Sequence, residues 1–258
     1  MGTELTIYDR AQFVALTDAS DAAEALATNL RGEIGEIDLI HVPTPAGGGL
    51  KWVIPGIEGE EITDEIVGLL VYYGSRGVLW PRTNATEGTS PLLLTTDLAK
   101  ARRIGDDYGD IDPDELAKYR IASLPGEWYD WQRLPWNQWG SGNGGVGKRC
   151  KESRILCILR ENEVLPLVVR AQPGSLKTVR PFVVRLMVPH YRAVVSLRLQ
   201  NSTSKSGVKY SQIAPRLIGA IDRNAGARIK EMYTDVLSRL FEGVTEFDVQ
   251  PDTEPPVV

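Results

Sequence analysis

A run of tryptophans near the middle of the chain holds the residues best suited to binding chemistry. Five aromatic residues fall within twelve positions, namely Trp128, Tyr129, Trp131, Trp136 and Trp139. The cations beside and after them are Arg133, Lys148, Arg149, Lys151 and Arg154. Bases of single-stranded nucleic acid stack on such rings for about 1–3 kcal/mol each, while Lys and Arg neutralise the phosphates. The pattern predicts a nucleic-acid surface. The alternative is a small core that anchors a long loop, since tryptophan is highly buried on average.

A second mixture of aromatic and basic residues surrounds the stretch Gly-Ser-Arg-Gly at residues 74–77. Apolar runs at residues 66–73 and 78–80 flank these four residues, and this predicts a β-hairpin. The candidate binding residues of the hairpin are Tyr72, Tyr73, Arg76, Trp80 and Arg82. Neighbouring residues of a strand point to opposite faces, so only one of the two tyrosines would face a groove. The alternative is a half-buried edge hairpin without a binding role.

Other motifs predict no catalysis, cofactor or metal. Residues 142–148 match the spacing of a phosphate-binding P-loop, but Arg149 stands where a Mg²⁺-binding Ser or Thr is needed. Two histidines, His41 and His190, and two cysteines make a poor zinc site, and Cys157 reads as a small buried residue. The acidic residues between 106 and 114 would suit a metal-dependent nuclease only if they converged on one site, which their spacing does not guarantee.

The net charge of −5 hides a strong asymmetry along the 258 residues. Residues 1–70 hold 3 basic and 13 acidic residues, a net charge of −10. Residues 148–216 hold 14 basic and 3 acidic residues, a net charge of +11, and residues 241–258 carry −5. A basic segment between acidic ends is typical of polyanion binding with an acidic tail. The alternative is a solvated basic surface balanced by an acidic N-terminal layer.

The hydrophobic pattern indicates short strands with a few helices. Helices are predicted at residues 20–29, in one or two turns at 112–120, at 175–187 and at 225–241. Strands are predicted at residues 37–42, 50–54, 154–160, 164–170, 193–200 and 208–218, and Glu161-Asn162-Glu163 is a predicted hairpin turn. Lys177 on the third helix and Arg198 on the strand after it complete the candidate binding residues.

This order of elements favours a mainly β fold with flanking helices, of α+β class, built on a small antiparallel OB-like barrel. The predicted organisation is an N-terminal helical segment at 1–36 and an OB-like domain at 37–241. That domain carries a long Trp- and Gly-rich insert at 83–147 and ends in a C-terminal helix. An acidic, Pro-rich flexible tail follows at 242–258. No apolar run approaches the roughly 20 residues that span a bilayer, and no secretory signal is read at the start. A cytoplasmic protein without a membrane partner is expected.

Several short elements between residues 134 and 186 are shared with a known family. They are Pro135/Asn137/Gly140/Ser141, Gly147/Lys148/Cys150/Lys151/Glu152, Leu165/Pro166 and Pro173/Ser175/Leu176/Lys177. The stretch resembles bacteriophage-encoded single-stranded-DNA-binding proteins with an OB-like core, and the hairpin at 66–81 resembles their early strand pair. Many members carry a Cys-x-x-Cys before the first element, where this chain has residues 128–133 without cysteine. This departure from the family pattern argues against a metal knuckle here.

These observations predict a non-enzymatic, non-sequence-specific binder of single-stranded DNA in phage replication or recombination, acting in the host cytoplasm. RNA binding and a homodimer stay open, and the acidic tail is a candidate contact for replication or recombination proteins. The alternative is a protein–protein interaction factor, such as a recombination accessory or a modulator of a host or phage enzyme. Its basic face would then dock an acidic partner surface.

Overall fold

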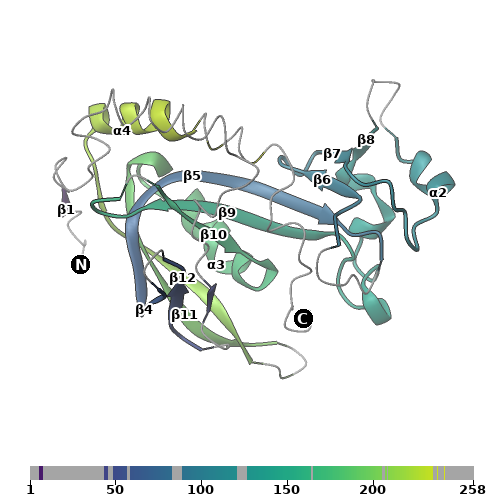
Figure 1. Ribbon diagram of the computed structural model, residues 1–258, viewed down its shortest axis with the longest axis horizontal. Helices are drawn as coiled ribbons and strands as arrows, with labels where there is room; N and C mark the ends of the chain where they lie inside the picture. Colours follow the sequence, from purple (N-terminus) through teal and green to yellow (C-terminus); the bar gives the residue numbers. More distant parts are fainter. Residues whose placement is uncertain are drawn as a thin grey trace. The chain divides into compact units, whose positions relative to one another are not determined.

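The computed structural model describes residues 6–7, 44–45, 49–56, 59–82, 89–120, 127–163, 165–204, 207, 209–234, 237 and 241 (Figure 1). The predicted helix at 20–29, the strand at 37–42 and the tail at 242–258 lie outside these residues. The chain divides into two compact units. Unit 1 comprises residues 1–73, 155–202 and 210–240, and unit 2 comprises residues 74–154, 203–209 and 241–258.

Unit 1 is built on paired strands, with both antiparallel and parallel neighbours. β11 (Ala193–Thr203) pairs with the first part of β5 (Glu65–Leu79) and lies beside β12 (Lys209–Ala220). β1 (Thr6–Ile7) is parallel to the end of β12. β9 (Lys151–Leu159) pairs with β5 and with β10 (Leu167–Ala171). A small second sheet follows the order β2 (Thr44–Pro45), β3 (Trp52–Ile54) and β4 (Glu61–Thr63).

The helices of unit 1 bury apolar side chains at helical spacing, as the sequence pattern predicts. α3 (Pro173–Val184) places Val179 in the core together with Leu156, Leu197 and Ile213. The C-terminal helix starts as α4 (Arg223–Ile229) and continues as the π-helical turn η8 (Lys230–Thr234). It is capped by the Asp222 carboxylate, which accepts from the amides of residues 224 and 225. These helices and the strands β11 and β12 confirm the local predictions.

Unit 2 packs around the later part of β5. That part pairs with β6 (Leu93–Thr95), which pairs with β7 (Lys100–Arg103), which in turn pairs with β8 (Trp128–Asp130). α2 (Pro113–Ala117) confirms the predicted turn at 112–120. The Trp-rich segment continues as three short 3-10 turns, η4 (Trp131–Arg133), η5 (Pro135–Asn137) and η6 (Asn143–Gly145). Trp131, Leu79 and Leu93 lie in the main core of this unit.

The described strands form open sheets. The strand order of the large sheet ends at β1 on one side and β8 on the other, so the described residues do not close into the expected barrel. β5 contributes to this open order, because its first part pairs with β11 and its last part pairs with β6. The strands beyond β11 and those beyond β6 do not pair with each other in the described part of the chain. The mainly β, antiparallel character with a few short helices agrees with the prediction. Within the described residues, no helix is long and apolar enough to cross a membrane.

The prediction of a hairpin turn at 74–77 is wrong, because these residues belong to the continuous strand β5. β5 is 15 residues long, and Figure 1 shows it as one uninterrupted, curved strand. Gly77 sits there because of packing: a Cβ on it would lie 2.6 Å from Thr95 Cγ2 and 2.7 Å from Trp131 Cζ2. By contrast, the predicted turn at Glu161-Asn162-Glu163 is confirmed, and Asn162 adopts a left-handed conformation with φ of 62°.

We expect Gly77→Ala to lower the free energy of unfolding by about 1–3 kcal/mol, because the added methyl has no space beside the Trp131 ring. Ser75→Ala is the matched control, since Ser75 lies two residues away on the same strand and is only half-buried. Urea denaturation of the two variants measures the difference. Equal stability of the two variants would show that the strand shifts to admit the methyl at no cost.

The buried position of His190 leads to a second prediction, a pH dependence of the free energy of unfolding. It lies in η7 (His190–Arg192), edge-on to the Tyr191 ring at a centroid distance of 5.5 Å. Its Nε2 is buried without a hydrogen-bond partner among the described residues. Burial, and secondarily the nearby Lys230 ammonium, hold the pKa of His190 below its usual 6.5. The unfolded chain therefore binds a proton more readily than the folded chain in this range.

The stability that comes from neutral His190 is fully present above the unfolded pKa of about 6.5 and is lost as the pH falls toward the lower folded pKa. We expect the free energy of unfolding to fall between pH 7.5 and 5.5 in the natural chain. The loss should be smaller in His190→Phe, which keeps an aromatic ring but does not titrate. Urea denaturation at the two pH values is the measurement, and equal losses in both proteins would contradict the role of His190.

Candidate nucleic-acid interface

Two of the candidate aromatic rings of unit 2 belong to its core. Trp131 is fully buried and packs on Gly77. Trp80 is 7% exposed and packs with Val78 and Leu94. Neither ring has a face open to a base, so the structure contradicts the prediction that these two rings stack on nucleic acid. It favours the loop-anchoring alternative for Trp131.

Two candidate cations are also buried, Arg76 at 1% and Arg154 at 6% exposure. The Arg76 guanidinium donates to the Phe241 carbonyl, and the Arg154 guanidinium donates to the Ser153 carbonyl at 2.9 Å. A buried charge persists only where hydrogen bonds or counter-charges replace water. The structure therefore contradicts direct phosphate contact by Arg76 and Arg154.

The predicted basic cluster at 148–151 is largely engaged within unit 2. Arg149 Nη2 donates to the Pro81 carbonyl at 2.8 Å and to the Asp110 carboxylate, and its side chain is only 12% exposed. Lys148 Nζ lies 3.6 Å from a Glu152 carboxylate oxygen. Lys151 is half-buried. Arg149 thus holds this end of the Trp-rich loop to Pro81 and Asp110, a role that sequence spacing does not reveal.

The remaining candidates differ in exposure. Half-buried rings are those of Tyr72, Tyr73 and Trp136. Tyr73 packs against the core of unit 1, and Trp136 meets Tyr119 edge-on at a centroid distance of 6.4 Å in unit 2. The exposed candidates are Arg82, Arg133, Trp139, Lys177 and Arg198. Two of these cations already have carboxylate partners, since Arg82 pairs with Asp107 at 3.3 Å and Arg198 pairs with Glu65.

A groove in unit 1 brings one of the exposed candidates together with residues that the sequence did not single out. α3 lies along an edge of β12, where Ser175 Oγ accepts from the Ile213 amide at 3.0 Å and Thr178 Oγ1 donates to the Ile213 carbonyl at 2.5 Å. Ser175 thus tethers a strand from within the helix, because α3 begins at Pro173, two residues before the predicted start at residue 175.

The groove between α3 and the strands has a volume of about 600 Å³. Its wall on α3 is formed by Lys177, Thr178, Pro181 and Phe182, and continues beyond the helix with Arg185, Leu186 and Met187. The opposite wall comes from β11 and β12 and is formed by Gln200, Ala214, Pro215 and Leu217. A volume of this size is typical of pockets that take small ligands or short segments of larger ones.

Among the described residues that line this groove, the charged ones are both positive. Lys177 and Arg185 line it, and no described lining residue is acidic. Neither cation forms an ion pair with any residue that the structure describes, whereas Arg160 and Arg198 of the same unit pair with Glu61 and Glu65. Two cations without a described carboxylate partner, beside apolar lining residues, suit an anion with a planar, apolar part.

Phe182 supplies the aromatic element of the groove. Its ring is partly buried against the core of unit 1 and also lines the groove, so packing holds it in place. Arg185 and Phe182 were missed from sequence, although Arg185 stands eight residues after Lys177 and therefore near the same side of a helix. The sequence pattern does not predict which residues of β11 and β12 form the facing wall.

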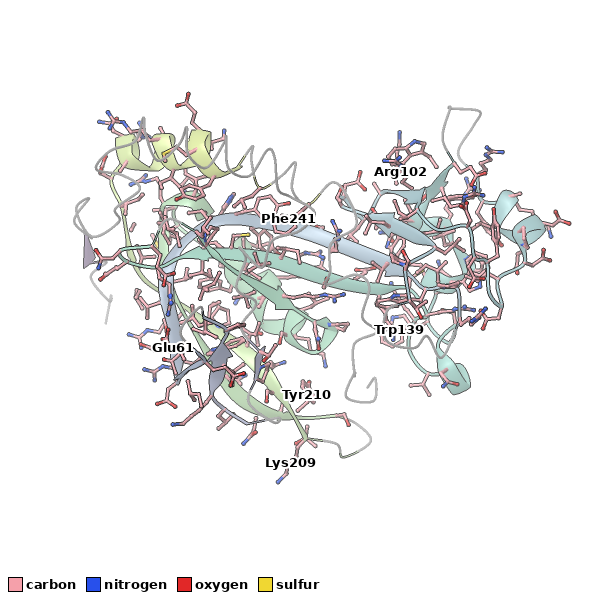
Figure 2. All side chains as sticks on the ribbon, viewed as in Figure 1. Glu61, Arg102, Trp139, Lys209, Tyr210 and Phe241 are labelled. Carbon is pink, nitrogen blue, oxygen red and sulfur yellow. The ribbon has the colours of Figure 1, made fainter. Side chains whose placement is uncertain are left out.

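Unit 2 presents a different exposed feature, the loop at residues 137–147. Trp139 is 71% exposed and Val146 is 53% exposed, and Figure 2 labels Trp139. The loop is held by hydrogen bonds: the Gly140 amide donates to the Gly147 carbonyl at 2.7 Å, and Ser141 Oγ donates to the Trp136 carbonyl at 2.7 Å. An indole exposed on a braced loop is available for stacking.

The described residues offer no metal cluster. No group of three or more His, Cys, Asp or Glu among them is placed to hold a metal ion. Cys150 and Cys157 are free and buried, which confirms the prediction for Cys157. Burial raises the pKa of the Cys150 thiol far above its usual value, so this side chain is not a reactive thiolate.

Searches of the chain against family models, curated proteins and solved structures find no significant match.

Proposed function

We propose that the chain is a non-enzymatic protein that binds single-stranded DNA without sequence preference. The observation that supports this best is the groove of unit 1, where Lys177, Phe182 and Arg185 line one wall and no acidic residue is found among the described lining residues. Cations neutralise phosphates, and an aromatic face accepts any base. Trp139 of unit 2 provides a second aromatic surface of the kind that stacking requires.

The wider role is proposed from the resemblance of residues 134–186. The phage-encoded proteins that this stretch resembles suggest DNA replication or recombination as the setting and the host cytoplasm as the place of action. They also suggest an OB-like core, although the described strands do not close into a barrel. RNA as an alternative ligand, a homodimer, and contacts of the acidic tail with replication or recombination proteins belong to the same proposal.

Binding of a fluorescent dT30 oligonucleotide to the full chain tests the function directly. We expect tight binding at 50 mM salt that weakens as salt rises, because phosphate contacts release counterions. A duplex of the same length should compete poorly, since its bases are not free to stack. Absence of binding to dT30 at low salt would contradict the proposal.

A protein–protein role is favoured by one observation of its own. Residues 137–147 contain no charged side chain, and they expose Trp139 and Val146. Tryptophan is enriched among residues that dominate protein interfaces. If dT30 does not bind, and a purified replication or recombination protein forms a stoichiometric complex that Trp139→Ala abolishes, this second function replaces the first.

A further inference from the structure

The order of side chains along the groove of unit 1 indicates how long a segment of single-stranded nucleic acid the groove can bind. Lys177, Pro181 and Arg185 recur at intervals of four residues, so they follow one side of α3 and its C-terminal cap. With a rise of 1.5 Å per residue, the Cα atoms of Lys177 and Arg185 stand about 12 Å apart. Phe182 lies between them in sequence and lines the same groove. The groove therefore presents a cation, an aromatic ring and a second cation in succession.

The facing wall limits what can enter. Gln200, Ala214, Pro215 and Leu217 carry no charge and close the groove from the strand side. A duplex keeps its base faces stacked inside, so it cannot bring a base onto a ring in the wall of a groove. An unpaired strand exposes base faces and phosphates at once. Inorganic phosphate or a mononucleotide would satisfy one cation and leave the other without a counter-charge.

We propose that this groove binds a segment of about three nucleotides of an unpaired strand, with phosphates on Lys177 and Arg185 and an intervening base stacked on Phe182. This inference rests on the proposed function and makes it specific. It assigns the recognition of single strands to unit 1, and it names the smallest ligand that occupies both cations.

The test uses the full chain and three ligands: 5′-phosphorylated trithymidylate, dTMP and inorganic phosphate, each competing with fluorescent dT30. We expect the trinucleotide to compete at a concentration at least tenfold lower than dTMP, with phosphate weaker still. Equal competition by the trinucleotide and dTMP would overturn the inference, because one cation alone would then account for binding.

The ring is tested with Phe182→Leu, which keeps apolar bulk against the core, and with Phe182→Tyr, which keeps the ring. We expect the leucine variant to bind the trinucleotide at least about fivefold more weakly, which is the lower end of one base stack. The tyrosine variant should bind it like the natural chain. Thermal unfolding verifies that both variants fold. If the leucine variant does not fold, the trinucleotide affinity of Arg185→Gln, a change on the exposed surface, tests the groove instead.

The outcomes separate the two proposals. If dT30 binds but neither Phe182→Leu nor Arg185→Gln weakens the trinucleotide, the strand is held elsewhere and this inference fails while the proposed function stands. If dT30 does not bind the natural chain, both fail together. If binding of the trinucleotide is weakened by both Phe182→Leu and Arg185→Gln, the result supports this inference and the proposed function.

Discussion

Replacing Lys177 and Arg185 together by glutamine should lower the salt dependence of dT30 binding by a defined amount. Each phosphate contact to a single strand contributes about 0.7 to the slope of log affinity against log salt concentration. Two contacts contribute about 1.4, which corresponds to an affinity loss of about 25-fold at 0.1 M salt. The effect is large because no described carboxylate pairs with either cation, so none of the described acidic groups competes with a phosphate for them.

A titration of fluorescent dT30 at four or five salt concentrations measures this slope. Arg180→Gln is the matched control, since Arg180 is exposed on the same helix but does not line the groove. The control should change the slope by less than a single contact does. If the double variant and the control have the same slope, binding depends on diffuse positive charge and not on this groove.

Trp139→Ala should weaken dT30 binding without changing the salt slope. Loss of one base stack costs about 1–3 kcal/mol, which is a factor of about 5 to 150 in affinity, and it releases no counterions. The protein should fold normally, because Trp139 is 71% exposed and surface substitutions cost little stability. The same titration as above measures affinity and slope together.

The control for this prediction is Trp139→Phe, which preserves a stacking face on the same braced loop. It should recover most of the lost affinity. An alanine variant that binds dT30 like the natural chain would remove Trp139 from the DNA surface and favour its use against a protein partner. A variant that changes the slope would show that the loop positions phosphates.

Local patterns predicted those elements whose conformation is decided by neighbours in sequence. The apolar spacing of Val179 and the residues around it marked α3, and Asn162 with its flanking acids marked the turn between β9 and β10. The pattern around residues 193–218 likewise predicted β11 and β12. In each case the hydrogen bonds and side-chain periodicity lie within a short stretch, so the sequence contains the necessary information.

The candidate site was predicted less well, because exposure depends on distant segments. Trp131 and Trp139 stand eight residues apart in the same aromatic run, yet one is fully buried and the other 71% exposed. Gly77, from β5, makes the space that takes the Trp131 ring. Arg149 reads as a phosphate ligand, but Asp110 and the Pro81 carbonyl engage it inside unit 2. No local rule distinguishes these residues.

The sequence by itself determined the composition of this protein: an aromatic run at residues 128–139, then a segment of net charge +11 between acidic ends, in a mainly β chain with few helices. Only the tertiary structure decided which of those charges are available. Carboxylates and carbonyls brought close by folding engage Arg76, Arg149 and Arg198, whereas Lys177 and Arg185 meet an uncharged wall from β11 and β12. The physical reason is that a cation's capacity to bind a phosphate depends on its counter-charges and its access to solvent, and both are set by residues far away in the chain.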